Sequence, residues 1–360
     1  MNKLIHIEID NKKIKNTELG LPYMGSKRRL ASKIVDHILQ VNPKCKYVYD
    51  LFGGGGAISF EFLKHTQIKK VIYNELNTGV TELLKDIQKN GITEKYYQFI
   101  DRETFHINKN SDTWLGGLCK VIWSFGSNQR SYLYNPDIAK YKEIYHRVIV
   151  NNENHLKEME EYIYNYMLET YGIDKPIKLR MPIKKDYQER RLEIRKQLTK
   201  YEKERKVSQC SRLEQLERFE QLQRLQQLQQ LESLQQLQSL QQLQRLQQLE
   251  IQNLSYEKVL INTPIDETII YLDPPYENTA HYQHKIDYDL FYKFVKKHKY
   301  KIYVSGYNCP LYEVNSFKHT ISLALGRNDT AIEKLYCNKK ERNKTIKIIP
   351  FFNTKSIKAK

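Results

Sequence analysis

Cysteine is scarce in this sequence, and the few cysteines are not spaced for a structural framework. The 360-residue chain has five of them, an odd number, and no two form a Cys-x-x-Cys motif. This argues against a disulfide scaffold and a zinc site, and it is typical of a reducing cytoplasm. The sequence also has no signal-peptide core after Met1, and no run approaches the roughly 20 apolar residues of a membrane-spanning helix. We therefore expect a cytoplasmic protein that needs neither a membrane nor a metal.

Glycine and proline are absent from residues 184–263. The first part of this stretch, residues 184–206, is densely charged. From Leu213 to Leu249 a leucine, or once Phe219, then recurs at every third position. Three residues turn an α-helix by about 300°, so these side chains circle the helix and form no coiled-coil stripe. Because Leu, Gln, Glu and Arg favour helix, we expect a helical insertion, with a 3₁₀-like form as the alternative.

Acidic residues are outnumbered by basic ones. Lys and Arg total 59 against 42 Asp and Glu, which gives a formal net charge of +17. Such an excess favours a polyanionic partner, either nucleic acid or an anionic membrane surface. The chain also has 27 tyrosines, and aromatic side chains mixed with positive charge suit stacked bases. A lysine-rich surface without such a partner is the plain alternative.

A glycine-rich turn joins a predicted strand to a predicted helix in the N-terminal part. The strand covers residues 47–50, the turn contains Gly53–Gly56, and the helix follows from Ala57. A second apolar run, residues 71–74, leads to Glu75, roughly 20 positions beyond the glycines, where a ribose-binding carboxylate is expected in nucleotide-binding βαβ units. The turn is neither Gly-x-Gly-x-x-Gly nor a P-loop. Taken alone, the glycine-rich turn fits an ordinary loop as well as it fits a ligand-binding turn.

Near the C-terminal part of the chain, the short apolar run of residues 269–272 predicts a buried strand that ends at Asp273. Pro274 and Pro275 stop further strand pairing, and Tyr276 follows at once. The residue before a proline is restricted to extended conformations. The expected result is a stiff loop that presents a carboxylate, free backbone carbonyls and an aromatic ring.

A polar and aromatic loop is predicted over residues 124–136, after an apolar helix. Asn, Gln and Arg side chains read base edges or bind phosphate. We therefore select four DNA-binding candidates here: Asn128, Arg130, Tyr132 and Tyr134. A plain helix–helix connection remains the alternative.

Three motifs now support a family resemblance. Pro22–Lys27, the pattern Asp50-x-Phe52-x-Gly54-x-Gly56 and the run Asp273–Tyr276 stand in the order of the Dam-like, D12-class (alpha-group) DNA adenine-N6 methyltransferases of phage type. The sequence resembles that family over residues 20–150 and 255–340, and the resemblance fails between them. It implies an α/β, Rossmann-like S-adenosylmethionine-dependent methyltransferase fold with an inserted, mostly helical target-recognition domain.

The resemblance also implies roles for individual residues. Asp273 and the Pro274 carbonyl would accept the two N6 hydrogens of a flipped-out adenine, and Tyr276 would stack on that base. The catalytic set is Asp273, Pro274, Pro275 and Tyr276. The cofactor-binding set is Tyr23, Lys27, Asp50, Phe52, Gly54, Gly56, Glu75 and Asp273. Family members usually carry Asp where Glu75 stands, so its contact with the ribose is the weakest of these expectations.

The expected organisation is a catalytic domain from residues 1–104 and 256–360, a target-recognition domain over residues 105–185, and a charged and Leu/Gln-rich insertion over residues 186–255. The partner would be double-stranded DNA in a bacterial or phage-infected host cell, with or without a cognate restriction enzyme. The sequence decides no oligomeric state, and a monomer is compatible with it. Two alternatives stay open: the same fold acting on RNA or on cytosine N4, and a catalytically inactive DNA-binding protein.

Overall fold

The computed structural model describes residues 19–172, 174–205, 245–276, 286–322 and 328–341. Its centre is a seven-stranded sheet with the order β3-β2-β1-β4-β5-β7-β6. The first five strands in this order are parallel, and β7 and β6 are antiparallel to their neighbours. The strands are β1 (Tyr47–Asp50), β2 (Lys70–Asn74), β3 (Leu249–Gln252), β4 (Thr268–Leu272), β5 (Lys301–Gly306), β6 (Tyr312–Ser322) and β7 (Asn328–Cys337).

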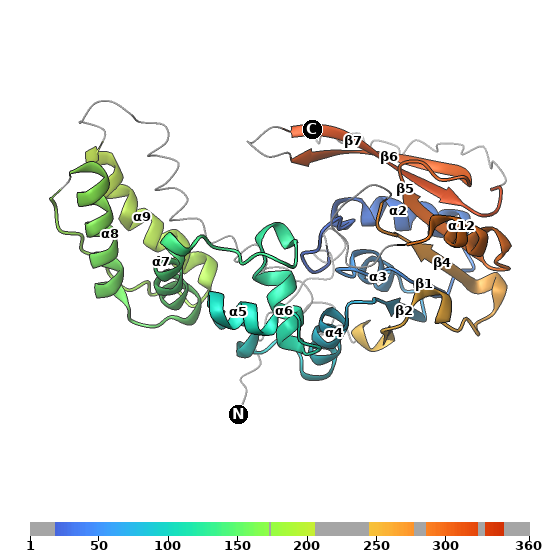
Figure 1. Ribbon diagram of the computed structural model, residues 1–360, viewed down its shortest axis with the longest axis horizontal. Coiled ribbons are helices and arrows are strands. Elements are labelled where there is room, and N and C mark those ends of the chain that lie inside the picture. Colours follow the sequence, from blue (N-terminus) through green and yellow to red (C-terminus); the bar gives the residue numbers. More distant parts are fainter. Residues whose placement is uncertain (1–18, 173, 206–244, 277–285, 323–327, 342–360) are drawn as a thin grey trace, which may run out of the picture.

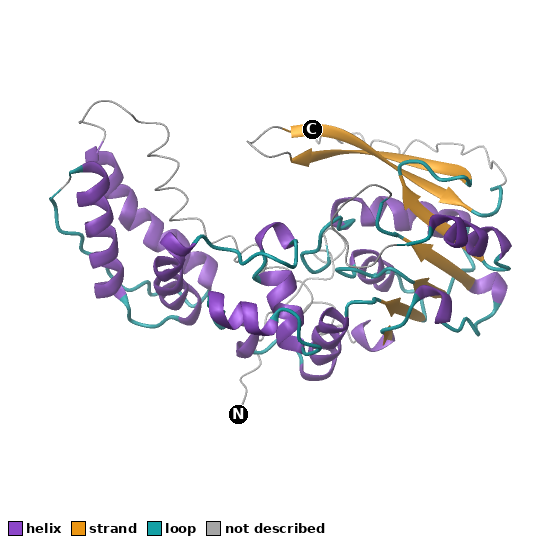
Figure 2. Cartoon of the chain, in the orientation of Figure 1, coloured by secondary structure: helices purple, strands orange, loops and turns teal. Residues whose placement is uncertain are grey.

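Both faces of the sheet are covered, which explains why its central strands are apolar throughout. Alternate residues point to opposite faces, so Val48 and Tyr271 pack in one buried cluster while Tyr49 and Ile270 pack in another. On the first face lie α2 (Arg28–Val41), α3 (Ala57–Leu63) and α4 (Thr78–Asn90); on the second lies α12 (Tyr288–Lys297). The layered α/β arrangement (Figure 2) is the Rossmann-like fold predicted from the sequence.

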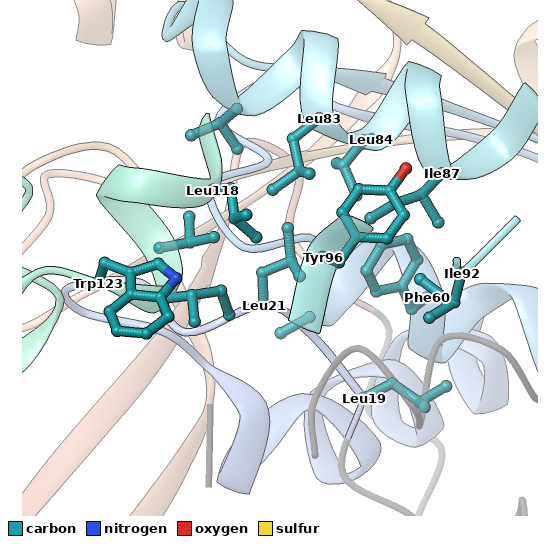
Figure 3. Close-up of a cluster of buried hydrophobic side chains, with 14 of the residues drawn as sticks. Leu19, Leu21, Phe60, Leu83, Leu84, Ile87, Ile92, Tyr96, Leu118 and Trp123 are labelled. Atoms are coloured by element: carbon teal, nitrogen blue, oxygen red, sulfur yellow. The ribbon is translucent and has the colours of Figure 1, made fainter. Parts of the chain in front are cut away.

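Two further helices, α5 (Arg102–Asn108) and α6 (Trp114–Ile122), extend the first cluster away from the sheet. The contact between α4 and α6 is very close, because a Cβ on Gly117 would lie 2.0 Å from the carbonyl oxygen of Gly79. Figure 3 shows side chains of this region, with Leu83 and Leu118 among them. The core of the catalytic domain therefore continues without interruption into the region predicted to recognise DNA.

The helices α7 (Pro136–His146), α8 (Leu156–Tyr171) and α9 (Tyr187–Arg205) form a lobe at the far end of the molecule (Figure 1). Ile194 and Leu198 of α9 are fully buried there. The Arg190 guanidinium donates to the carbonyl oxygens of Ile149 and Val150, the latter at 2.8 Å. Helix α9, which follows the predicted domain boundary at residue 185, thus packs as part of the helical lobe, and its many charges gave no indication of its buried positions.

A strand of the sheet also lies before residue 255, the other predicted end of the insertion. Leu249–Gln252 is strand β3, which pairs in parallel with β2 and belongs to the catalytic sheet. Before it, Arg245–Gln248 forms a 3₁₀ turn in which Leu246 is buried. The rest of the leucine repeat, up to residue 244, lies outside the described residues. The repeat concealed this strand because Leu249 continues the three-residue spacing while already pairing with Val71.

No helix among the described residues is long and apolar enough to cross a membrane.

Candidate active site

The candidate site lies at the carboxyl ends of β1, β2 and β4. The sheet grows outward in both directions from the pair β1 and β4, and ligands of open α/β sheets bind in the crevice where the strand order reverses in this way. A cavity of about 560 Å³ opens at this place. Of the acidic residues that line it, three stand at strand ends: Asp50 is the last residue of β1, Glu75 follows β2, and Asp273 follows β4. The sequence predicted all three.

The glycine turn after β1 closes against the N-terminal segment. The Leu21 amide donates to the Gly55 carbonyl at 2.7 Å, and a Cβ on Gly55 would lie only 2.3 Å from the Leu21 carbonyl oxygen. Gly54 has a positive φ of 49°, and a Cβ there would lie 3.2 Å from the Tyr23 ring. These glycines bring the Pro22–Lys27 motif beside the strand ends, so two motifs far apart in the sequence line one cavity.

Glu75 organises the turn from the β2 side. Its carboxylate accepts hydrogen bonds from the Gly54 amide at 2.7 Å, from the Asn77 amide at 2.9 Å and from the Tyr23 hydroxyl at 3.4 Å. Burial raises the pKa of this carboxyl, and the backbone hydrogen bonds oppose that rise. The structure therefore places Glu75 between the Tyr23 motif and the glycine turn.

Asp50 has an unsatisfied acceptor. One of its oxygens accepts from the Ser59 hydroxyl at 2.7 Å, whereas Oδ1 is buried with no hydrogen-bond partner among the described residues. Burial, with the carboxylates of Asp273 and Glu75 nearby, raises the pKa of Asp50 to about 7. A buried acceptor without a donor is costly. A bound ligand that offers a donor or a positive charge to Oδ1 would remove that cost.

Asp273 is held in a cluster of charged and hydroxyl groups. The Lys27 ammonium donates to Asp273 Oδ1 at 2.8 Å and to the Tyr276 hydroxyl at 2.7 Å. That hydroxyl in turn donates to Glu333 of β7 at 2.7 Å. Burial raises the pKa of Asp273 to about 6, with Lys27 opposing the shift and Glu333 adding to it. The side chain is 17% exposed, so a ligand in the cavity can reach it.

The proline carbonyls differ in their partners. The Pro275 carbonyl accepts from the Tyr288 hydroxyl of α12. Among the described residues none donates to the Pro274 carbonyl or to Asp273 Oδ2, and both residues line the cavity. The Tyr276 ring is tilted against Tyr307, with centroids 4.8 Å apart, and also lines the cavity.

Two more predicted cofactor residues take supporting positions. Phe52 lines the cavity and packs against Tyr256 and Phe291, at ring-centroid distances of 5.2 and 6.1 Å. Gly56 caps α3 with a φ of 77°, a conformation that glycine adopts readily. Strand β3 also ends beside the cavity, and Leu254 and Ser255, which follow this strand, line the cavity.

The loop over residues 124–136 forms the opposite wall, and only part of it faces the cavity. Asn128 and Arg130 line the cavity, as does Gln129, whose side-chain oxygen accepts from Asn77 Nδ2 at 2.9 Å. The Asn128 carboxamide oxygen accepts from the Arg130 amide at 2.9 Å, so this side chain shapes the turn. Ser127 and Gln129 both have positive φ values, of 56° and 61°.

Tyr132 and Tyr134 do not reach the surface. They are 5% and 3% exposed, inside the main buried cluster. The Tyr132 hydroxyl donates to the Ile100 carbonyl at 2.7 Å, and its ring packs against Phe105. A ring buried in this way presents no face to a base, so in this structure the two tyrosines, predicted as DNA-binding candidates, anchor the loop in the core. Phe125 of the same loop is instead 58% exposed.

Sequence reasoning missed several residues of this site: Asn77, Asp112, Lys120, Ser255 and Glu333. Asn77 could have been found, because Asn before a helix is a frequent N-cap, and its side chain accepts from the Val80 amide. Glu333 could not, since a single acid in a strand of mixed polarity carries no local signal.

A Rossmann-like sheet with three strand-end carboxylates around one crevice defines the general class, an enzyme of nucleotide-binding type. The comparison with known proteins then gives the particular family. Residues 23–116 match the family model of the D12 class N6 adenine-specific DNA methyltransferases. This match over residues 23–116 confirms the predicted family and the predicted enzyme class. The matched range contains the N-terminal motifs, and Asp273–Tyr276 lies beyond it. No curated protein matches the chain.

Proposed function

We propose that this enzyme transfers a methyl group from S-adenosylmethionine to N6 of an adenine that is flipped out of double-stranded DNA. One observation carries the proposal most directly. Asp273 Oδ2 and the Pro274 carbonyl are two acceptors without a described donor, and Asp273 lines the same cavity as Asp50 and Glu75. An exocyclic amino group has two hydrogens, and this loop offers two acceptors for them.

The residues around the cavity fit the proposed cofactor. The unsatisfied Asp50 Oδ1 suits an ammonium donor, and Glu75 stands where hydroxyl donors of a ribose are expected. The glycine turn allows a ligand close to the main chain, and Tyr23 and Phe52 add apolar surface. When bound, S-adenosylmethionine supplies an electrophilic methyl group on a sulfonium, a cation that a carboxylate-lined cavity favours.

The Asp273 loop then acts on the base. The lone pair of an exocyclic amine is delocalised into the ring, which makes the nitrogen a poor nucleophile. Hydrogen bonds from that amine to Asp273 and to the Pro274 carbonyl draw the nitrogen toward tetrahedral geometry and free its lone pair. The main contributions of the protein are therefore positioning and electrostatics. Asp273 need not be a strong base, because the proton can leave after the new bond has formed.

The base must leave the duplex to reach this cavity, since the loop lies at a strand end inside the protein. Asn128 and Arg130 line the opposite wall, which makes them the first candidates for contacts with the DNA around the flipped base. A net charge of +17 supports a tight, salt-dependent association with the phosphate backbone.

The test measures methyl transfer from tritiated S-adenosylmethionine to unmethylated plasmid DNA on filters. Asp273→Ala and Asp273→Asn should lose transfer almost completely and keep most DNA affinity, because phosphate contacts dominate that affinity. Asp266→Asn is the matched control: it removes an exposed aspartate just before the same strand and should behave as wild type. Near-wild-type transfer by Asp273→Ala would overturn the assignment.

Long-read sequencing of DNA from cells that express the enzyme identifies the modified base and its sequence context together. Modification of cytosine instead of adenine would refute the adenine assignment. In the filter assay, transfer of the tritiated methyl group to RNA instead of DNA would refute the DNA substrate. No transfer to any nucleic acid by a protein that still binds DNA would favour an inactive DNA-binding protein.

A further inference from the structure

Glu333 is a buried carboxylate that belongs to none of the three motifs around the cavity. It lies on β7, a strand that follows the Asp273 loop by more than fifty residues, and it is only 3% exposed. Its Oε1 accepts a hydrogen bond from the Tyr276 hydroxyl at 2.7 Å and lies 3.8 Å from the Lys27 ammonium. Burial of a carboxylate costs roughly several kcal/mol unless the group is paired with a cation and hydrogen-bonded. Both partners that Glu333 uses here are residues predicted to serve the reaction.

The hydrogen bonds of this cluster have a defined direction. An ionised Glu333 can only accept hydrogen bonds, so the Tyr276 hydroxyl donates its single proton to Glu333. The hydroxyl oxygen then accepts from the Lys27 ammonium, which also donates to Asp273 Oδ1. One cation thus serves two carboxylates and one hydroxyl, and a fourth contact, to the Gly25 carbonyl at 3.4 Å, fixes it from the N-terminal side.

This direction matters for Asp273. The Tyr276 hydroxyl and Asp273 Oδ1 both lie within hydrogen-bond distance of the same ammonium. If Glu333 did not accept the hydroxyl proton, the hydroxyl could turn and donate to Asp273. It would then compete with the amino hydrogens of the base for that carboxylate, and it would release Lys27 from its place between the two acids.

We propose that Glu333 is a positioning residue for methyl transfer: through Tyr276 and Lys27 it keeps the Asp273 carboxylate oriented and open toward the amino group. The inference rests on the proposed function of Asp273. Glu333 touches no reacting atom, so its effect should fall on the chemical step and not on ligand binding.

The electrostatics of the cluster add a separate, measurable consequence. Two charged side chains act on the pKa of Asp273, those of Lys27 and Glu333. The Asp273 carboxylate in turn raises the pKa of Asp50 and of the hydroxyls of Tyr271, Tyr276 and Tyr307, which also face the cluster. The negative charge of Glu333 raises the pKa of Asp273, and Lys27 lowers it. Removal of the Glu333 charge should therefore move the pKa of Asp273 down.

The experiment compares Glu333→Gln, Glu333→Ala and the control Glu313→Gln in the full-length protein. Gln keeps the size of Glu333 and an acceptor oxygen but removes the charge. Glu313, on the neighbouring strand β6, pairs with Lys334 at 2.9 Å near the surface, so its substitution removes an equal charge from the same hairpin, away from the cluster. Single-turnover methyl transfer is measured from pH 5 to 9, together with the Kd values for cofactor and DNA.

We expect Glu333→Gln to slow the single-turnover step roughly tenfold to a hundredfold, the loss of one charge-assisted hydrogen bond. Glu333→Ala should slow it at least as much, both Kd values should stay near wild type, and the acid limb of the Glu333→Gln pH profile should move to lower pH. A second readout needs no cofactor: ¹³C NMR titration of the Asp273 carboxyl, assigned with Asp273→Asn, should show the same downward shift of its pKa.

Three outcomes would overturn the inference. Wild-type rates in Glu333→Gln would remove any role for the charge, and a loss confined to cofactor or DNA binding would make the role one of binding. Full rescue by Gln of a defect seen in Glu333→Ala, with no shift of the Asp273 pKa, would reduce Glu333 to a packing residue. These results differ from failure of the proposed function, in which wild-type protein and Glu313→Gln would themselves transfer no methyl group.

Discussion

The carboxyl edge of the sheet and the loop over residues 124–136 line the same cavity but are built in opposite ways. At the sheet edge, Asp50 and Asp273 are fixed by strands that are buried on both faces, so their side chains have nowhere else to go. The loop is held by turn hydrogen bonds such as those to Asn128, and it contains positive-φ residues. The comparison teaches that position in a buried strand constrains a functional side chain more strongly than residue type in a loop does.

The loop itself contains a second contrast. Tyr132 and Tyr134 anchor it in the core, whereas Phe125 and Arg130 remain toward the cavity side or the surface. Two of its aromatic residues are therefore structural, although the loop as a whole is polar. The following predictions distinguish residues that anchor the structure from residues that act in binding or catalysis. They run from the largest expected effect to the smallest.

Tyr132→Ala should lower the free energy of unfolding by about 3–5 kcal/mol, because it leaves a cavity in the core and removes the donor to the Ile100 carbonyl. Urea titration followed by circular dichroism measures this. The matched control, Phe125→Ala, removes an exposed ring from the same loop and should change stability by less than about 0.5 kcal/mol. Normal stability with lost DNA binding in Tyr132→Ala would support the DNA-binding role predicted from the sequence.

Asp50→Asn should stabilise the protein at pH 8, on the order of 2 kcal/mol, and weaken cofactor binding. The pKa of Asp50 in the folded state is raised to about 7, so its favourable contribution exists only at low pH and is lost as the pH rises through that value. The gain should therefore shrink at pH 5. Urea titrations at both pH values and calorimetry with S-adenosylmethionine measure the two effects. Unchanged stability at pH 8 together with full cofactor affinity would contradict the view that burial of the Asp50 carboxylate is unfavourable and that a bound cofactor compensates for it.

The single-turnover rate should fall about tenfold per pH unit below about pH 6, which corresponds to about 1.4 kcal/mol per unit. The pKa of Asp273 is raised to about 6, and only the ionised carboxylate offers both oxygens as acceptors. Above that pH the rate should be level until other groups titrate. A quenched-flow pH series measures it, with DNA affinity followed at each pH. An acid limb near pH 4 would mean that the carboxylate is far better solvated than its burial indicates.

Arg130→Ala should weaken DNA binding by about 1 kcal/mol and reduce the slope of log K against log salt by about 1, as expected when one phosphate contact is lost. Fluorescence anisotropy with a labelled duplex at several salt concentrations measures both. Lys69→Ala, an exposed lysine at the opposite end of the sheet, should change neither quantity. If Arg130→Ala equals this control, the loop wall does not contact DNA.

Most of the sheet edge could be predicted from the chain, and most of the loop could not. The run before Asp273 is short, β-branched and ended by two prolines, which defines both the strand and the residue at its end. The glycine turn and Glu75 were found by their spacing from the first strand. In the loop no periodicity separates inward from outward positions, so composition alone made Tyr132 and Tyr134 DNA-binding candidates, and it gave no indication that both side chains are buried.

The packing of the elements beside the predicted boundaries at residues 185 and 255 could not be predicted for a related reason. Helix α9 is rich in charge along its whole length, yet Arg190 directs its guanidinium to main-chain carbonyls and Ile194 lies in the core. At the other end, Leu249 fits the leucine repeat and the strand equally well. A pattern that fits two structures cannot choose between them, and the choice was made by the neighbours: the turn at Ile149 in one case and β2 in the other.

The sequence by itself determined the chemistry at the strand ends, because the order of apolar run, carboxylate and proline is a local property of the chain. It also determined the family and the Rossmann-like fold. Only the tertiary structure decided how these pieces meet. It brought Lys27 from the N-terminal motif and Glu333 from β7 to the two sides of Tyr276, beside Asp273. The reason is physical: such a cluster depends on strand order and register across more than 300 residues, which no local pattern encodes.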